Sequence, residues 1–208
     1  MLNLRHSQHG ITLVELMIGL VIVGILFALA VPAYNGWIQN QKIRTAAESL
    51  LNGIQLARNT AVTNNTQARF ALCDSASSWQ VLVVSAVAAP DAADTVCGAG
   101  AAVTAGNEVR VQERSGQEGS ASVAVLATSI NPPPATIPIA DDGSRSITFN
   151  GFGRVVANDP AVGGTSISAM EVAVQGGNRQ LLVTVRTGGS VRMCDPSLLL
   201  AATDPRHC

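Results

Sequence analysis

A run of apolar residues close to the start of the chain is its most pronounced pattern. Residues 11–31, ITLVELMIGLVIVGILFALAV, contain one charged side chain, Glu15, near the beginning of the run. A helix rises about 1.5 Å per residue, so this run spans about 31 Å, the thickness of the hydrocarbon core of a bilayer. The pattern predicts a membrane-crossing helix over residues 11–34. Pro32 lacks a backbone N–H and predicts a bend or an interruption in that helix.

A narrower apolar stripe follows over residues 35–64. Its members recur at alternating spacings of four and three residues: Ile43, Ala47, Leu50, Ile54, Ala57 and Ala61. This spacing places them on one face of an amphipathic helix. Turn-forming residues at 63–65 predict the end of that helix. We therefore expect one long helical element, half transmembrane and half amphipathic.

Residues 65–208 show a third pattern, in which short stretches rich in Val and Ile are separated by Gly, Pro, Asn or Asp. Such stretches predict β-strands, here over 67–73, 79–85, 108–114, 121–126, 146–150, 167–174, 180–187 and 190–194. Gly176-Gly177-Asn178 predicts a hairpin within 167–187, and Gly188-Gly189 predicts a second. The expected fold class is α+β, with the long N-terminal helix packed on one antiparallel sheet assembly that forms a head.

Composition and charge narrow the functional classes. Of the 208 residues, 47% are hydrophobic and 13% are charged, against about 25% charged in a typical soluble domain. Thirteen Lys and Arg stand against 14 Asp and Glu, a net charge of −1, so no strong basic field favours a nucleic-acid protein. Lys42 is the only lysine, and it lies in the helical pattern.

Four cysteines indicate an oxidising compartment. Cys73, Cys97, Cys194 and Cys208 lack the CxxC spacing of a structural zinc site, and their wide separation is typical of disulfides. Three pairings are open. Local pairing of Cys73 with Cys97 and of Cys194 with Cys208 is favoured because each bridge closes a loop rich in turn residues. A zinc site that also uses His207 is the alternative.

The leader and the apolar run allow more than one interpretation. Arg5 precedes the run, and this positive flank predicts a cytoplasmic N-terminus with the head outside. Ala28-Leu29-Ala30 imitates the cleavage site of a secretory signal peptide, but the run is long for one and contains an acid. A plain membrane anchor, in which Glu15 only complements the helix dipole, is a further alternative.

Residues 10–17, GITLVELM, together with the apolar run and Pro32, resemble the N-terminus of type IV pilins and type II secretion pseudopilins. The resemblance implies a pilin fold and a prepilin peptidase that removes leader 1–10 by cutting after Gly10 and then N-methylates Ile11. It also implies storage in the inner membrane as a single-pass protein with the head in the periplasm, followed by incorporation into a pilus or pseudopilus. Ile11 departs from the Phe that is usual at this position.

Glu15 has a physical role in that scheme. After cleavage, the α-amino group of Ile11 has an ordinary pKa of about 8 and is mostly cationic at neutral pH. Glu15 of one subunit can pair with this amine of a neighbour, which hides two charges from lipid or from a filament core. The resemblance implies this contact, and a role for Pro32, during assembly.

Residues 49–62, SLLNGIQLARNTAV, a following strand, residues 147–154, ITFNGFGR, and a cysteine-bounded C-terminus resemble minor pilins of the FimT and FimU type and the related secretion pseudopilin H. The resemblance implies a low-abundance subunit that helps to initiate, prime or cap a type IV pilus, with other minor pilins and the major pilin as partners. A pseudopilin of type II secretion is the alternative. Without the resemblance, Arg58 in the first segment is expected on a solvated helix face.

Enzymatic chemistry is not expected. HExxH, GxSxG, SxxK and P-loop motifs do not occur in the sequence, and His207 is the only histidine after the leader. A triad of Asp204, His207 and a serine is possible on paper, but a terminal histidine is more simply a surface residue. Asp141-Asp142 beside Gly143 predicts a turn and is under-liganded for calcium. We therefore expect neither a cofactor nor a metal.

A DNA-binding minor pilin that serves DNA uptake is an alternative of another class. Arg186 and Arg192 should point outward from alternating strands, and Arg206 lies in the loop that a Cys194–Cys208 bridge would close. Three such arginines would bind phosphate weakly and with a strong salt dependence. The arginines are scattered, so ordinary solvated side chains are the simpler interpretation.

Overall fold

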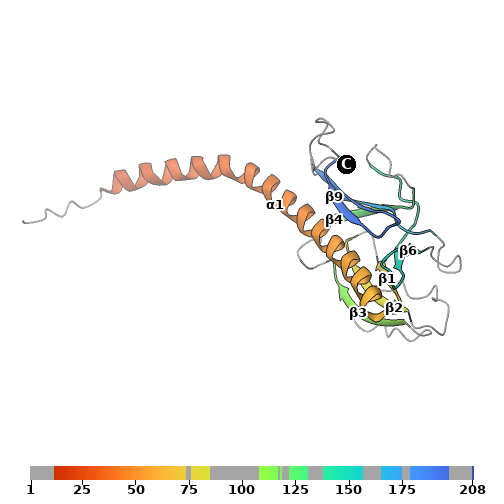
Figure 1. Cartoon of the computed structure of the whole chain (residues 1–208). Helices are drawn as coiled ribbons and strands as arrows, with labels where there is room; N and C mark the ends of the chain where they lie inside the picture. The colour runs from red at the N-terminus through yellow and green to blue at the C-terminus, as the bar shows by residue number, and fades with distance from the viewer. Residues whose placement is uncertain are drawn as a thin grey trace, which may run out of the picture. The chain divides into compact units, whose positions relative to one another are not determined.

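The computed structural model of the chain describes residues 12–73, 76–84, 108–116, 118, 122–130, 138–156, 165–174, 179–196 and 208, and at 29–33, 84 and 108 it describes the backbone alone. Within these ranges there are one helix and nine strands (Figure 1). The chain divides into two compact units, Met1–Ile38 and Gln39–Cys208.

Helix α1 (Leu13–Asn64) is a single element of 52 residues. It continues through Pro32, so of the two alternatives predicted there the interruption is wrong and the bend stays a prediction. A proline removes one backbone hydrogen bond at a local cost of about 3 kcal/mol, which leaves the turns on either side intact. The helix ends where the sequence predicts. Asn65 has a φ of 49°, its N–H bonds the Val62 carbonyl, and the N–H of Thr66 bonds the Ala61 carbonyl, so the end is a Schellman cap.

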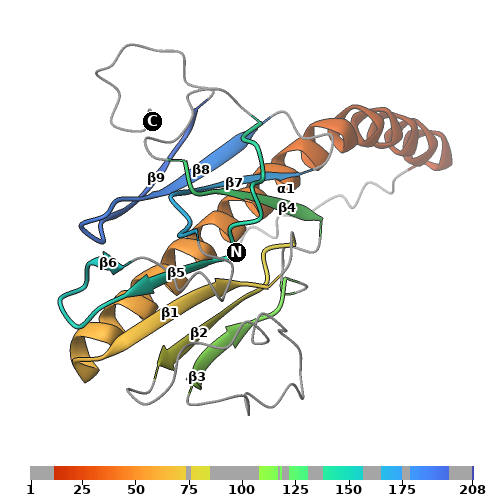
Figure 2. The same cartoon turned by 90° about the vertical axis from the view of Figure 1, so that its right-hand side faces the viewer.

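The head contains two antiparallel sheets, where the sequence predicts one assembly. The five-stranded sheet has the order β3 (Glu108–Arg114), β2 (Trp79–Val84), β1 (Gln67–Leu72), β5 (Ser146–Phe149) and β6 (Val155–Val156). The four-stranded sheet has the order β4 (Val123–Thr128), β7 (Ala169–Val174), β8 (Gln180–Val185) and β9 (Val191–Cys194). Figure 2 shows the second half of α1 behind both sheets. The α+β fold class is therefore confirmed, with its sheet divided in two.

All eight predicted strands are present, with ends that differ by a few residues. β4 runs from Val123 to Thr128, two residues beyond its predicted end, and the two-residue strand β6 is one that the sequence pattern misses. β7 pairs with β8 and β8 with β9, which confirms both hairpins. The turn at 175–178 lies outside the described residues.

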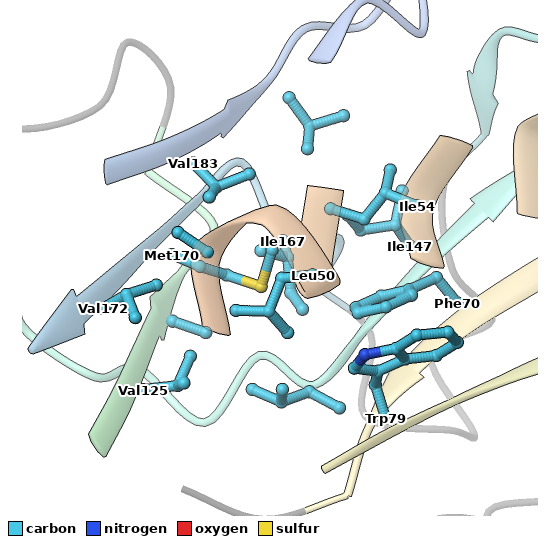
Figure 3. Close-up of a cluster of buried hydrophobic side chains, with 14 of the residues drawn as sticks. Leu50, Ile54, Phe70, Trp79, Val125, Ile147, Ile167, Met170, Val172 and Val183 are labelled. Carbon is cyan, nitrogen blue, oxygen red and sulfur yellow. The ribbon is translucent and has the colours of Figure 1, made fainter. Parts of the chain in front are cut away.

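One core lies between α1 and both sheets (Figure 3). The predicted stripe is confirmed, since each of its members is 0% exposed: Ile43, Ala47, Leu50, Ile54, Ala57 and Ala61. Phe70 of β1 and Trp79 of β2 lie with ring centroids 5.9 Å apart and press against α1 at Gly53, where a Cβ would be 2.9 Å from Phe70. Trp79 Nε1 donates to Ser49 Oγ over 2.8 Å, which satisfies the buried indole.

Candidate functional site

Glu15, the predicted assembly residue, lies in the first turn of α1 and is exposed. Its backbone N–H donates to Thr12 Oγ1 over 3.2 Å, and the Thr12 carbonyl accepts the N–H of Leu16 over 3.2 Å. Thr12 is therefore the N-cap, and the Glu15 carboxylate occupies the end where the helix dipole favours a negative charge. Gly10 and Ile11 lie outside the described residues. Processing and the pairing of Glu15 with an amine stay predictions.

The apolar side chains in the first half of α1 are exposed around its whole circumference. Their exposed fractions run from 46% at Val23 to 75% at Leu13, for Leu13, Val14, Leu16, Met17, Ile18, Leu20, Val21, Ile22, Val23, Ile25, Leu26 and Phe27. A helix of this kind is stable only in apolar surroundings, which either lipid or other apolar helices provide.

Among the side chains that the structure describes, which are interrupted at residues 29–33, no helix combines the length and the apolarity that a membrane span requires. The membrane-crossing segment 11–34 and a role for Pro32 in assembly stay predictions from the sequence.

Arg58 joins α1 to a turn from each sheet, so the solvated position considered for it is wrong. Its Nε donates to the carbonyl of Gly153 over 3.1 Å. Gly153, with a φ of 72°, lies in the turn between β5 and β6, and Gly189, with a φ of 82°, lies in the turn between β8 and β9. A Cβ on Gly189 would be 1.9 Å from the Gly153 oxygen and 3.0 Å from Arg58 Nε. The guanidinium therefore fits against two turns that approach each other at glycine.

The same β5–β6 turn presents Phe152, which is 85% exposed. Asn150 Oδ1 accepts the N–H of Phe152 over 3.0 Å and that of Arg154 over 3.1 Å, and the Asn150 carbonyl accepts the N–H of Gly153 over 2.8 Å. The Asn150 N–H also donates to the Arg154 carbonyl over 3.0 Å, so four bonds to one residue hold the turn. Phenylalanine is one of the aromatic residues enriched at protein interfaces, and the sequence pattern does not single out this one.

Asp141 and Asp142 form a turn, as the sequence predicts. Asp141 accepts two bonds from the guanidinium of Arg145, over 2.8 and 2.9 Å, and this hydrogen bonding lowers the pKa of Asp141. Partial burial opposes ionisation of Asp142, but hydrogen bonds from Ser144 and Ser129 outweigh it and hold the pKa of Asp142 well below its usual range. Among the described residues, no three His, Cys, Asp or Glu side chains are grouped to hold a metal.

The C-terminal disulfide is confirmed. Cys194, at the end of β9, is bonded to Cys208 with Cα atoms 5.1 Å apart. Cys73 is also disulfide-bonded. Its proposed partner Cys97 lies outside the described residues, so that pairing stays a prediction.

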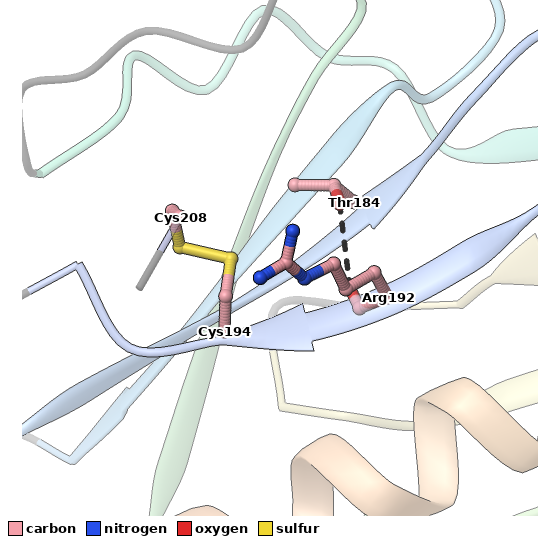
Figure 4. The surroundings of a disulfide bond; sticks show 4 residues. All are labelled: Thr184, Arg192, Cys194 and Cys208. Carbon is pink, nitrogen blue, oxygen red and sulfur yellow. Dashed lines mark hydrogen bonds between the residues drawn. A yellow bond between two sulfur atoms is a disulfide. The ribbon is translucent and has the colours of Figure 1, made fainter. Parts of the chain in front are cut away.

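Of the three arginines predicted to contact DNA, the structure describes Arg186 and Arg192. Arg186 and Arg192 are both exposed, as predicted. Figure 4 shows the Arg192 side chain on the side of the disulfide, and Thr184 Oγ1 donates to the Arg192 carbonyl over 3.4 Å. Arg206 and His207 lie outside the described residues. A contact with DNA stays a prediction.

One buried acid is a residue that the sequence reasoning missed. Glu171 in β7 is 1% exposed and lies on the face of its sheet that also carries the small apolar cluster of Ile139, Ala169, Leu182 and Cys194. Its Oε2 accepts the N–H of Ile139 over 2.7 Å. Burial raises the pKa of Glu171 and outweighs this hydrogen bond. The signal was present as the one charge in the apolar strand AMEVAV.

Comparison with known families accounts for both halves of the chain. The prokaryotic N-terminal methylation motif matches residues 5–31, and the family of the type II transport protein GspH matches residues 46–190, more than half of the chain. The chain belongs to the GspH family. GspH family proteins are minor pilins and pseudopilins, structural and non-enzymatic subunits of type IV pili or of type II secretion.

Individual relatives match this GspH family chain either over a short stretch or at low sequence identity. The type IV major fimbrial protein FimA of Dichelobacter nodosus is 42% identical over 53 residues, 26% of this chain and 32% of FimA, so the chain spans about a third of the length of such relatives. Pseudomonas aeruginosa FimU, a type IV minor pilin, is 13% identical over 77% of this chain and 94% of its own, with a TM-score of 0.45. E. coli GspH is 12% identical over 76% of this chain and 92% of its own length, with a TM-score of 0.43.

Proposed function

We propose that this GspH family protein is a minor pilin that helps to initiate, prime or cap a type IV pilus. The observation that carries the proposal is the first half of α1, whose apolar side chains are exposed all round and whose first turn holds one acid. Such a helix needs lipid before assembly and other helices after it. The match to the N-terminal methylation motif supports a processed amine at the same end of the helix.

The proposed sequence of events starts in the inner membrane. A prepilin peptidase cuts after Gly10 and methylates Ile11, which leaves a cationic amine at the start of α1. The helix stays in the bilayer with the head in the periplasm until Glu15 pairs with the N-terminal amine of a neighbouring subunit. That pair shields two charges that would each be unfavourable alone in an apolar filament core.

Replacement of Glu15 tests the proposal. We expect Glu15→Ala to remain in the membrane fraction but to be depleted from sheared filaments by about tenfold or more, the equivalent of about 1.4 kcal/mol. Glu48→Ala is the matched control, since Glu48 is an acid on the same helix that forms an exposed ion pair with Arg44. Unaltered incorporation of Glu15→Ala would contradict the charge-pairing mechanism.

A pseudopilin of type II secretion is the second candidate, and the match to the GspH family favours it. Deletion of the gene in its own host separates the two functions. Loss of surface pili with secretion intact supports the minor pilin, whereas loss of secretion with pili intact supports the pseudopilin. Neighbouring genes for pilins or for a secretion channel give an independent indication.

A further inference from the structure

Two aromatic side chains lie together at the far end of the exposed apolar helix. Tyr34 and Trp37 are stacked with ring centroids 5.8 Å apart, and they are 59% and 56% exposed. They are the single tyrosine and one of the two tryptophans of the chain. The other tryptophan, Trp79, is buried in the head. Both rings of the stacked pair carry a polar group on an otherwise apolar surface.

The distance along the helix from Glu15 to the aromatic pair matches the thickness of a bilayer. No charged residue occurs between Glu15 and Lys42. Tyr34 is 19 residues after Glu15, which corresponds to about 29 Å of helix, close to the hydrocarbon thickness of about 30 Å. After Trp37 the sequence turns polar, with Gln39, Asn40 and Gln41. Glu15 and the aromatic pair therefore stand at opposite ends of one bilayer-length segment.

We propose that Tyr34 and Trp37 form a membrane-interface anchor whose occupant is the lipid headgroup layer on the side of the head. Tyrosine and tryptophan concentrate at this level because their rings contact acyl chains while the hydroxyl and the indole N–H reach water. The inference rests on the membrane-stored stage of the proposed function. It adds a fixed depth for the helix, which a uniform apolar surface does not set by itself.

The anchor has a consequence for the acid at the other end. With the aromatic pair held at one boundary, the Glu15 carboxylate lies at the opposite headgroup layer, where an ionised acid is far less unfavourable than at the bilayer centre. Glu15 can then wait in the membrane as an accessible charge. It becomes desolvated when the subunit enters a filament, and at that step the amine of a neighbour is required.

Fluorescence quenching by brominated lipids measures the depth of Trp37. The full-length processed protein is placed in vesicles of phosphatidylethanolamine and phosphatidylglycerol that carry bromine either close to the headgroup or close to the chain end. The difference between wild type and Trp37→Phe isolates Trp37 from buried Trp79. We expect quenching of Trp37 to be at least roughly twofold stronger with the shallow label. Equal quenching by both labels, deeper quenching, or none would overturn the anchor.

Tyr34→Leu tests whether the two rings act as a pair. An apolar side chain at this position lets the segment sink, so the ratio of shallow to deep quenching of Trp37 should fall. An unchanged ratio would overturn the paired anchor. Filament incorporation of Glu15→Ala is a separate measurement. If quenching places Trp37 away from the headgroup layer but incorporation into filaments still depends on Glu15, the anchor alone is refuted. If incorporation does not depend on Glu15, the proposed function is refuted.

Discussion

Arg58 Nε donates to the carbonyl oxygen of Gly153, a residue 95 positions later in the chain, over 3.1 Å. Gly189 packs on that same carbonyl. One guanidinium therefore joins α1 to the β5–β6 turn of one sheet and lies next to the β8–β9 turn of the other. The contact explains why an arginine lies on this helix face. Its long aliphatic stem packs on the protein surface, while its guanidinium reaches a carbonyl acceptor.

Replacement of Arg58 should lower the free energy of unfolding of the head. Arg58→Ala removes a charged donor from a half-buried contact, and we expect the free energy of unfolding to fall by about 1–2 kcal/mol. Urea unfolding of the full chain in detergent, followed by near-ultraviolet circular dichroism, measures this change. Arg44→Ala is the matched control, because Arg44 forms an exposed pair with Glu48, which contributes less than about 0.5 kcal/mol. Equal effects of the two variants would contradict the structural role of Arg58.

Gly189 should tolerate alanine far less well than Gly143. Both glycines have a positive φ, 82° and 80°, so the left-handed backbone alone costs either alanine about 1–2 kcal/mol. A Cβ at Gly143 has no atom within 4 Å, whereas at Gly189 it would be 1.9 Å from the Gly153 oxygen. We expect Gly189→Ala to lose about 2 kcal/mol or more beyond the loss in Gly143→Ala. Melting temperatures of the two variants, compared directly, decide the point.

Glu171→Gln should stabilise the protein at neutral pH. Burial raises the pKa of Glu171 in the folded state, so the folded protein binds this proton more tightly than the unfolded chain. The contribution of Glu171 to the free energy of unfolding is therefore fully present below its pKa in the unfolded chain, about 4.3. It is lost as the pH rises through the pKa of Glu171 in the folded protein. Glutamine stays neutral and keeps an acceptor for the Ile139 N–H. The free energy of unfolding of Glu171→Gln should exceed that of wild type at pH 7, and the two should converge below about pH 4.

Glu171→Ala provides the contrast for that experiment. It removes the acceptor of the Ile139 N–H as well as the charge, and an unmade buried hydrogen bond costs about 1–3 kcal/mol. Relative to Glu171→Gln, this variant should be less stable at every pH. A gain at neutral pH equal to that of Glu171→Gln would show that the Ile139 contact contributes nothing.

Loss of the Cys194–Cys208 bridge should destabilise the head. The bridge joins residues 14 apart in sequence, and a loop of about 15 residues corresponds to about 3 kcal/mol of loop-closure entropy. A double Cys194→Ser/Cys208→Ser variant tests this by thermal unfolding and avoids a free thiol. Alkylation followed by mass spectrometry verifies that Cys73 remains oxidised. A melting temperature equal to that of wild type would show that the packing of β9 holds the segment without the bridge.

Local patterns predicted the elements of this fold well, because they depend on neighbours in sequence. β3 has the predicted bounds, and the helix ends at the predicted turn. The division into two sheets depends instead on pairings such as Ala68 with Phe149, which are distant in the chain and leave no local periodicity. β6 is too short to show a strand pattern, and β4 extends to Thr128 because the alternation continues in small residues that the pattern underweights.

The residues of the candidate site also differ in whether a local sequence pattern reveals them. Glu15 stands out in sequence because a charge interrupts an apolar run. Arg58 and Gly153 do not, because their relation exists only after two turns meet on α1. Phe152 looks like an ordinary core residue between two glycines, and its exposure follows from the turn that Asn150 holds. Side chains with a local signal are therefore predictable, whereas those defined by tertiary contacts are not.

The scarcity of lysine gives the subunit an unusual chemical selectivity. Lys42 is the only lysine of the chain, and its Nζ lies 3.5 Å from Ser122 Oγ in the head. A processed subunit then has just one other aliphatic amine, at its new first residue. Carbodiimide coupling of intact filaments joins amines to nearby carboxylates without a spacer, so in a Lys42→Arg background each amide bond that starts from an amine of this subunit must start from its N-terminal nitrogen.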